Sequence, residues 1–246
     1  MSSEKFTWNI PGGRVQRLSE AAFSAEHTLI AGTTGSGKSV LLNGMIRDLL
    51  RLYAPGEASL VLIDPKAMEL EGFRHLPHTI GYTDTEQGAE RVLRQVLELM
   101  ARRNRYCKEH GLRRYNGGAV YVVIDELHPL ATGEHKKTFR RLLSLLLTQA
   151  RAANIHIIAA TQIPNRASLP ADIVSLFTLR IGLGTMDGIE SKQIIGIKGC
   201  EELPPHGLAL VRYNRSIQAV EIPMTDEAEL AKLIGYWTEQ SARCSA

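Results

Sequence analysis

The stretch LIAGTTGSGKSVLLNGMI, residues 29–46, decides the fold class of this chain. Small, flexible residues in it separate an apolar run of strand length from a run with the apolar periodicity of a helix. Residues 32–39 match the pattern G-x-x-x-x-G-K-[ST] in full, and that pattern requires a strand before it and a helix after it. The stretch therefore predicts a phosphate-binding loop (P-loop) in an α/β fold.

The residues of this loop indicate how it would bind a nucleotide. The glycines let backbone N–H groups turn inward around the phosphates, close to the positive end of the helix dipole. Lys38 is expected to reach the β- and γ-phosphates, and the Ser39 hydroxyl to bind Mg²⁺. The alternative is a glycine-rich turn that carries a lysine by chance. We predict ATP and Mg²⁺ as cofactors, with these nucleotide-binding residues: Gly32, Thr33, Thr34, Gly35, Ser36, Gly37, Lys38, Ser39 and Val40.

Strand-like and helix-like segments alternate along the rest of the chain. Five runs rich in Val and Ile mostly lack alternation, which is typical of strands buried on both faces: 27–31, 59–64, 119–125, 155–161 and 178–183. Helical patterns begin at Ser39, Thr85 and Lys136. Two further strands, 207–213 and 216–222, precede a closing helix from Thr225. The order predicts a mainly parallel, twisted sheet with helices on both faces.

Length and composition limit the possible classes of protein. A chain of 246 residues with 44% hydrophobic residues can bury the core of one α/β domain. The net charge of +3 permits a nucleic-acid partner without requiring one. Three cysteines without a CxxC pair argue against a disulfide framework or zinc ribbon, and His75 and His78 are interpreted as loop residues. No run approaches the roughly 20 apolar residues of a membrane span. We expect a cytoplasmic protein that does not itself contact a membrane.

The segment AVYVVIDEL, residues 119–127, supplies carboxylates for hydrolysis. An apolar strand that ends in an acidic pair places Asp125 at the edge of the sheet beside the P-loop, where it would hold Mg²⁺ through its water shell. Glu126 is then the candidate base that accepts a proton from the attacking water. The alternative is an acidic pair that merely begins a loop. Transfer of the phosphoryl group to another substrate would need a second pocket, so hydrolysis is favoured.

The next predicted strand ends in Thr161-Gln162, just before Pro164. A polar pair at this edge of the sheet would face the same crevice, and Gln162 would sense the γ-phosphate by hydrogen bonding. A plain strand-end turn explains the pair equally well. Both interpretations remain open at this point.

Four blocks of the sequence together resemble the FtsK/SpoIIIE family of hexameric double-stranded DNA translocases. They are HTLIAGTTGSGKSVLLNGMI from His27, VLIDPKAMELEGFRHLPH from Val61, VYVVIDEL from Val120 and ARAANIHIIAATQIP from Ala150. The likeness runs from about residue 24 to residue 222. It implies a RecA-like motor domain that forms a ring around duplex DNA and moves it by ATP hydrolysis. We therefore expect an N-terminal segment, 1–23, and a single RecA-like ATPase domain, 24–246.

The resemblance also gives roles to charged residues that a motif alone would not single out. Arg180 lies at the position of the family's arginine finger, which acts on the nucleotide of the neighbouring subunit. Lys192 matches a basic pore-loop residue that contacts the DNA backbone, and Lys198 is a second pore candidate. The alternatives are a strand-end ion pair for Arg180 and a solvated helix charge for Lys192.

Some features depart from the family or stand apart from it. Ile163 occupies a position where an arginine is usual, and the sequence shows no membrane segment, long linker or winged-helix module. These departures favour a stand-alone motor of a plasmid, phage or integrative element, with membrane or recombination proteins as possible partners. The basic run 101–115 is interpreted as the exposed side of a helix rather than as the DNA site. The alternative function is a related ring ATPase that acts on protein, or a nucleotide switch with little turnover.

Overall fold

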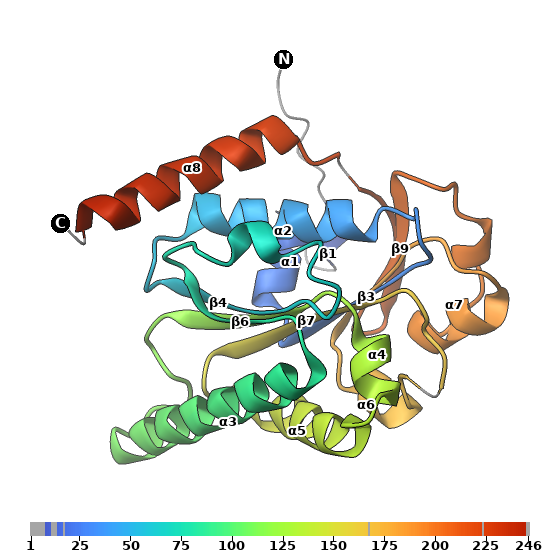
Figure 1. The fold of residues 1–246 in the computed structure, drawn as a ribbon. Coiled ribbons are helices and arrows are strands. Elements are labelled where there is room, and N and C mark those ends of the chain that lie inside the picture. The colour runs from blue at the N-terminus through green and yellow to red at the C-terminus, as the bar shows by residue number, and fades with distance from the viewer. Residues whose placement is uncertain (1–7, 11–13, 17, 167, 223, 245–246) are drawn as a thin grey trace.

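An eight-stranded sheet forms the centre of the protein in this computed structural model, which describes residues 8–10, 14–16, 18–166, 168–222 and 224–244. The strand order is β10-β9-β8-β3-β7-β6-β4-β5 (Figure 1). The strands are β3 (His27–Ala31), β4 (Ala58–Ile63), β5 (Thr79–Thr83), β6 (Ala119–Ile124), β7 (Ile155–Thr161), β8 (Leu179–Gly182), β9 (Leu208–Tyr213) and β10 (Ser216–Glu221). A separate pair, β1 (Trp8–Ile10) and β2 (Arg14–Gln16), lies near the N-terminus.

The sheet is mainly parallel, as predicted. Strands β5, β4, β6, β7, β3 and β8 run parallel to their neighbours, and only the hairpin of β9 and β10 joins the described sheet in antiparallel fashion. The carboxyl ends of the parallel strands therefore lie at one edge, where a ligand of an α/β fold binds. Of these strands, β5 was not predicted. Four of its five residues are partly or fully exposed, so it lacks the continuous apolar run of the inner strands.

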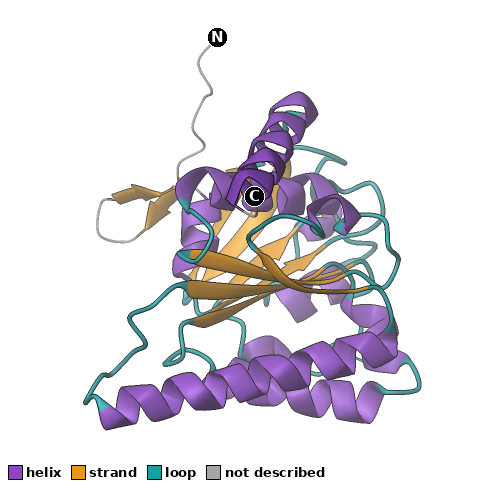
Figure 2. Cartoon of the chain, turned by 60° about the vertical axis from the view of Figure 1, so that its left-hand side comes forward, coloured by secondary structure: helices purple, strands orange, loops and turns teal. Residues whose placement is uncertain are grey.

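Helices cover both faces of the sheet, which confirms the predicted fold class (Figures 1 and 2). One face carries α1 (Leu18–Ser24), α2 (Lys38–Leu52) and α8 (Glu227–Cys244). The other carries α3 (Glu86–Glu109), α4 (Leu127–Thr132), α5 (Lys136–Gln149) and α6 (Ala171–Ser175). The remaining elements are α7 (Gly188–Ile194) and the short 3₁₀ helices η1 (Glu71–Phe73) and η2 (Cys200–Glu202).

The inner strands bury both of their faces because successive side chains enter different cores. In β6, Val120, Val122 and Ile124 belong to the core under α3 and α5. Tyr121 and Val123 belong to the core under α1 and α2. A strand that is buried on both faces has a continuous apolar run in its sequence, and for this reason the inner strands could be predicted. Residues of α1, among them Phe23, are part of the same core, and the expected domain boundary at residue 24 stays a prediction.

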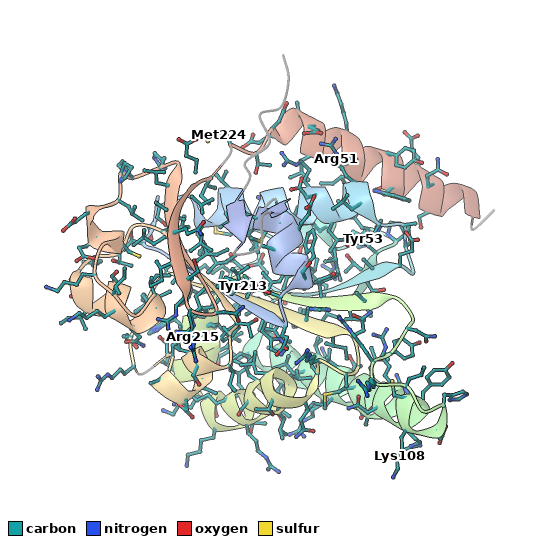
Figure 3. All side chains as sticks on the ribbon, turned by 180° about the vertical axis from the view of Figure 1, so that it is seen from behind. Arg51, Tyr53, Lys108, Tyr213, Arg215 and Met224 are labelled. Atoms are coloured by element: carbon teal, nitrogen blue, oxygen red, sulfur yellow. The ribbon has the colours of Figure 1, made fainter. Side chains whose placement is uncertain are left out.

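Helix α8 is fastened to the helix that follows the P-loop. The Trp237 indole N–H donates to the Leu50 carbonyl at 3.0 Å, and Arg51 pairs with Glu229 at 2.7 Å. Arg51 lies beside α8 in the view from behind (Figure 3). Within the described ranges, no helix combines the length and apolar character needed to cross a membrane.

Candidate functional site

The P-loop connects β3 to α2 and leaves the first turn of that helix open to a ligand. Gly37 is the N-cap of α2 with φ of 96°, and no side chain caps the helix. Gly35 also has a positive φ, of 81°, a conformation that glycine adopts without strain. The uncapped N–H groups and the positive end of the helix dipole suit a phosphate group. The predicted nucleotide-binding residues, 32–40, therefore share one loop and helix start.

The loop is attached to two neighbouring strand ends. The Gly32 N–H donates to the Thr161 carbonyl at 3.2 Å. The N–H and hydroxyl of Thr33 both donate to the Gly184 carbonyl, at 2.9 and 3.1 Å. The Thr34 hydroxyl donates to Gln162 Oε1 at 3.1 Å. The attachment to Gly184, just beyond β8, was not foreseen, because it depends on β8 lying next to β3.

Lys38 and Asp125 form a buried ion pair at the base of this loop. Lys38 Nζ lies 2.7 Å from Asp125 Oδ1 and donates to the Asp125 carbonyl at 2.9 Å. The side chains are only 4% and 1% exposed. Asp125 Oδ2 and Ser36 Oγ are buried without a hydrogen-bond partner among the described residues. A carboxylate and a hydroxyl of this kind suit a hard cation and a phosphate, so the donor set fits magnesium nucleotide.

Glu126 lies next to this pair and organises a second set of hydrogen bonds. Its Oε1 accepts from the Thr161 hydroxyl at 2.8 Å and from the N–H groups of Gln162 and His128 at 3.1 and 3.2 Å. Its Oε2 accepts from the Gln162 N–H at 3.0 Å and lies 3.9 Å from Lys66 Nζ. Glu126 is also the N-cap of α4, a helix not predicted from the sequence.

The structure thus brings Lys38, Ser39, Asp125, Glu126 and Gln162 to one edge of the sheet. Gln162 reaches both the P-loop through its amide oxygen and Glu126 through its backbone N–H. The same edge holds the loop of residues 64–70, whose lysine contacts Glu126. From the sequence alone, the IDPK segment, residues 63–66, contributes only to the family resemblance. Strand order was the missing information, since β4 pairs with β6.

Arg180 lies apart from this cluster in the same subunit. Its guanidinium donates to the carbonyls of Phe177 and Ile194, at 3.1 and 3.3 Å. Burial, and then the nearby Arg212, lower the pKa of Arg180. Arg212 in turn donates to the Ile195 carbonyl at 2.8 Å. Both arginines therefore hold the end of α7, and the role of Arg180 as a finger for a neighbouring subunit stays a prediction.

The predicted pore lysines lie on the surface around α7. Lys192 and Lys198 are both exposed. Large exposed apolar side chains surround them in the sequence: Met186, Ile189 and Ile197. The basic run, by contrast, follows the buried face of α3 formed by Val92, Val96 and Met100, as predicted.

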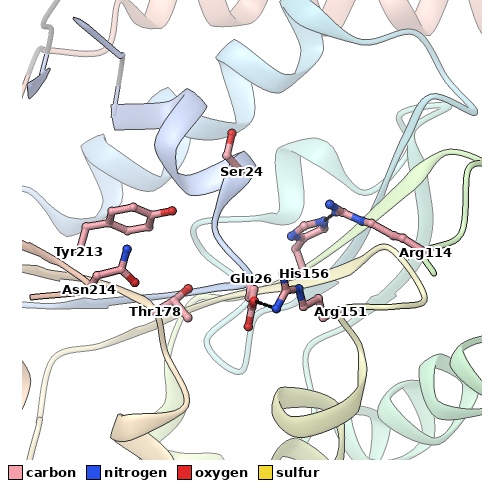
Figure 4. Close-up of a pocket in the computed structure, with 8 residues that line it drawn as sticks. All are labelled: Ser24, Glu26, Arg114, Arg151, His156, Thr178, Tyr213 and Asn214. Atoms are coloured by element: carbon pink, nitrogen blue, oxygen red, sulfur yellow. Dashed lines mark hydrogen bonds and ion pairs between the residues drawn. The ribbon is translucent and has the colours of Figure 1, made fainter. Parts of the chain in front are cut away.

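Two other features of the structure lie outside the P-loop cluster. His78 contacts the Tyr53 carbonyl through Nε2 at 3.0 Å, and burial lowers its pKa, as expected for a structural histidine. A cavity of about 190 Å³ opens at the opposite, amino-terminal edge of the strands (Figure 4). An ion pair between Glu26 and Arg151, 2.8 Å long, lies at its rim. None of the predicted site residues lines it.

The fold is similar to that of solved ATPases. The pCW3 conjugation coupling protein TcpA, in monomer form with ATPγS, matches with a TM-score of 0.74 and 23% identity, over 94% of this chain and 69% of that one. The cytoplasmic domain of the type VII secretion ATPase EccC of Thermomonospora curvata matches with a TM-score of 0.73 and 22% identity, over 96% of this chain and 30% of that one. These matches concern the fold.

Sequence comparison identifies relatives over most of the chain. The DNA translocase FtsK of Rickettsia prowazekii (strain Madrid E) is 33% identical over 87% of this chain and 35% of that protein. The DNA translocase FtsK of Borreliella burgdorferi (strain ATCC 35210 / DSM 4680 / CIP 102532 / B31) is 32% identical over 73% of this chain and 25% of that protein. The chain spans about a third or less of the length of these relatives, and a mobile-element role stays a prediction. Residues 12–128 match the model of the FtsK/SpoIIIE family. The resemblance predicted from the sequence is thereby confirmed, and the chain belongs to the FtsK/SpoIIIE family.

Proposed function

We propose that this protein is an ATP hydrolase that acts in the cytoplasm as a ring and moves double-stranded DNA. The observation that carries the proposal is the cluster of Lys38, Asp125 and Glu126 beside an uncapped helix start. Its relatives of the FtsK/SpoIIIE family, named DNA translocases, support DNA as the substrate.

Nucleotide binding is assigned to the P-loop. The N–H groups of residues 32–40 would surround the phosphates. The Lys38 ammonium, which now pairs with Asp125, would pair with the β- and γ-phosphates instead. Ser39 and Asp125 would hold Mg²⁺, which neutralises phosphate charge when bound. The unpartnered Asp125 Oδ2 supports this assignment, because a buried carboxylate oxygen without a partner is otherwise costly.

Hydrolysis is assigned to the neighbouring polar groups. Glu126 would accept the proton of the attacking water, which would have to lie between the carboxylate and the γ-phosphate. Gln162 would sense that phosphate, because its side chain already contacts Thr34 of the P-loop. The two residues are joined through the Gln162 N–H, so a change at one would reposition the other.

The ring and the DNA contact are assigned to the region around α7. Arg180 would act on the nucleotide of a neighbouring subunit, and Lys192 and Lys198 would contact DNA phosphates in the pore of a hexamer. Exposed Met186, Ile189 and Ile197 support an assembly surface here, because large apolar side chains rarely gather in the open on a monomer.

The test measures ATP hydrolysis with and without linear duplex DNA over a range of salt concentrations. Duplex should stimulate hydrolysis, and the effect should fall steeply with salt because binding displaces counterions from phosphates. Lys192→Ala should weaken duplex binding about equally for all sequences and reduce the salt slope by roughly one ion per contacting subunit. Lys137→Ala, an exposed lysine on α5, serves as the matched control.

The outcomes separate the proposal from its alternatives. If the rate of ATP hydrolysis is the same with and without duplex DNA at every salt concentration, a ring ATPase that acts on protein is favoured. Tight ATP binding with negligible turnover would favour a nucleotide switch. Unchanged DNA affinity in Lys192→Ala would remove that residue from the DNA site.

A further inference from the structure

The loop that follows β4, residues 64–70, is held in a single conformation by one buried carboxylate. Asp64 Oδ2 accepts from the N–H groups of Met68, Glu69 and Leu70, at 2.9 to 3.0 Å. Asp64 Oδ1 accepts from the Lys66 N–H at 3.3 Å. Ala67 has φ of 51°, a left-handed conformation that costs free energy for a residue with a Cβ. A loop built in this way fixes where the Lys66 side chain begins.

The strand order places this loop beside the proposed base. Strand β4 pairs with β6, and the Asp125 N–H donates to the Ile63 carbonyl at 3.0 Å. Lys66 Nζ consequently lies 3.9 Å from Glu126 Oε2. The Lys66 side chain is 42% exposed, whereas that of Glu126 is 3% exposed. One end of the pair is therefore inside the site and the other is reachable from solvent.

The two carboxylate oxygens of Glu126 differ in how many further hydrogen bonds they can accept. Oε1 already accepts three hydrogen bonds, from His128, Thr161 and Gln162. Oε2 accepts one, from Gln162, and faces Lys66. A base needs an oxygen that can accept a hydrogen bond from the attacking water. Oε2 is the oxygen with that capacity, and the Lys66 ammonium is the nearest positive charge to it among the described ion pairs.

We propose that Lys66 is a positioning residue that restrains Glu126 and keeps basal hydrolysis slow. The ammonium lies 3.9 Å from Oε2, in an ion pair without a hydrogen bond, and its positive charge opposes protonation of that oxygen. The inference rests on the proposed role of Glu126 as the base. A merely structural role for Lys66 predicts the opposite sign, because damage to a site lowers turnover.

The test replaces Lys66 by methionine, which keeps the aliphatic length and removes the charge. Because a partly exposed ion pair contributes little, Lys66→Met should raise DNA-free turnover at saturating ATP by about two- to fivefold. ATP affinity should stay unchanged, because the P-loop is untouched. Lys66→Arg should keep the low rate, and Lys137→Met is the matched surface control.

Salt gives an independent readout. Ions screen a partly exposed pair, so wild-type DNA-free turnover should rise as salt is increased from about 50 to 300 mM. The rate of Lys66→Met should respond less. Equal salt responses in the two proteins would contradict an ion-pair restraint.

The variant Glu126→Gln, alone and combined with Lys66→Met, separates the proposed restraint by Lys66 from the proposed role of Glu126 as the base. If Glu126→Gln alone retains turnover, Glu126 is not the base and the proposed mechanism fails first. If Glu126→Gln is inactive and Lys66→Met fails to raise turnover while its melting temperature is unchanged, only the restraint is overturned. A gain that persists in Lys66→Met/Glu126→Gln would also overturn it, because the effect would not act through Glu126. Should Lys66→Met fold poorly, Lys66→Gln gives the same charge change, and lowered or unchanged turnover there also overturns the restraint.

Discussion

The ion pair of Lys38 and Asp125 shows how the site is organised at the scale of single residues. Each of the two side chains is almost fully buried, and each neutralises the other. A buried pair contributes little net stability, but loss of one partner leaves an uncompensated charge. The pair also holds the Lys38 side chain against Asp125, the residue that follows β6. In our proposal, the phosphates bind Lys38 and Mg²⁺ binds Asp125 when nucleotide binds, so each residue exchanges its partner for a ligand.

Lys38→Ala and Glu126→Gln should therefore fail in different ways. Lys38→Ala should lose ATP binding and lower the free energy of unfolding by about 3 kcal/mol, because Asp125 stays buried without its partner. Glu126→Gln should bind ATP with normal affinity and lose turnover, since an amide cannot accept the proton. Binding of a fluorescent ATP analogue, phosphate release and urea unfolding distinguish the two. Near wild-type turnover of Glu126→Gln would show that another group activates the water.

The sequence was sufficient to predict the residues of the P-loop but not all of their contacts. Pattern and context gave residues 32–40 because a phosphate-binding loop imposes its glycines and lysine locally. The contact between Thr33 and Gly184, and that between Lys66 and Glu126, join segments far apart in the chain. Such contacts depend on which strands are neighbours, and hydrophobic periodicity does not contain that information.

At the scale of elements, helices and strands could be predicted from the sequence where they are long and have a clear hydrophobic periodicity or capping residue. Helix α3 begins after Thr85, whose hydroxyl accepts from the Gly88 N–H as an N-cap. The missed elements are short or partly exposed, such as α4, α6 and β5. Helix α4 has six residues with Pro129 among them, and packing rather than propensity determines it.

The pairing of β3 with β7 makes stability depend on pH through a buried histidine. His27 is 1% exposed, and its Nδ1 accepts from the Ile157 N–H at 3.1 Å. Burial, with a smaller contribution from His156, lowers the pKa of His27 from 6.5 to about 4. The folded protein therefore keeps His27 neutral at a pH where the unfolded chain binds a proton.

The free energy of unfolding should accordingly fall as the pH drops from about 7 towards 4 and be fully present above the unfolded pKa. His27 alone accounts for about 2 kcal/mol of loss at pH 5. Urea unfolding at pH 5 and pH 8 measures this difference in the free energy of unfolding. His27→Asn keeps an acceptor but does not titrate, so it should have a smaller difference between the two pH values. An equal difference in wild type and variant would assign the effect to other groups, such as His156, whose pKa burial also lowers.

At the scale of the whole molecule, the strand order brings the carboxyl ends of β3, β4, β6 and β7 to one edge of the sheet. The P-loop, the acidic pair, Gln162 and Lys66 meet there because each follows one of these strands. Alternation of strands and helices predicted the parallel sheet, and the polar residues at two strand ends predicted that Asp125 and Gln162 face the P-loop. Arg180 lies on β8 with its side chain committed to the end of α7, so the cluster within one subunit has no arginine from this position.

A finger that acts between subunits is tested by mixing two inactive variants. Arg180→Ala should bind ATP and lose turnover by a factor on the order of 10³ if its guanidinium stabilises the transferring phosphoryl group of a neighbour. Lys38→Ala should also be inactive, although it keeps Arg180. In mixed rings, a Lys38→Ala subunit can supply the arginine that an Arg180→Ala site lacks. Hydrolysis should therefore return on mixing, and wild-type activity should rise with protein concentration as rings form.

Structural damage must be separated from loss of the finger, because Arg180 also holds the Ile194 carbonyl. An unchanged melting temperature of Arg180→Ala would show that α7 remains in place, and Arg212→Ala provides a matched control that removes the neighbouring contact to Ile195. If Arg212→Ala loses as much turnover as Arg180→Ala, both arginines act by holding α7. If mixed rings form but stay inactive, Arg180 does not act between subunits. Recovery on mixing has no explanation within one subunit, because neither inactive protein then contains a complete site.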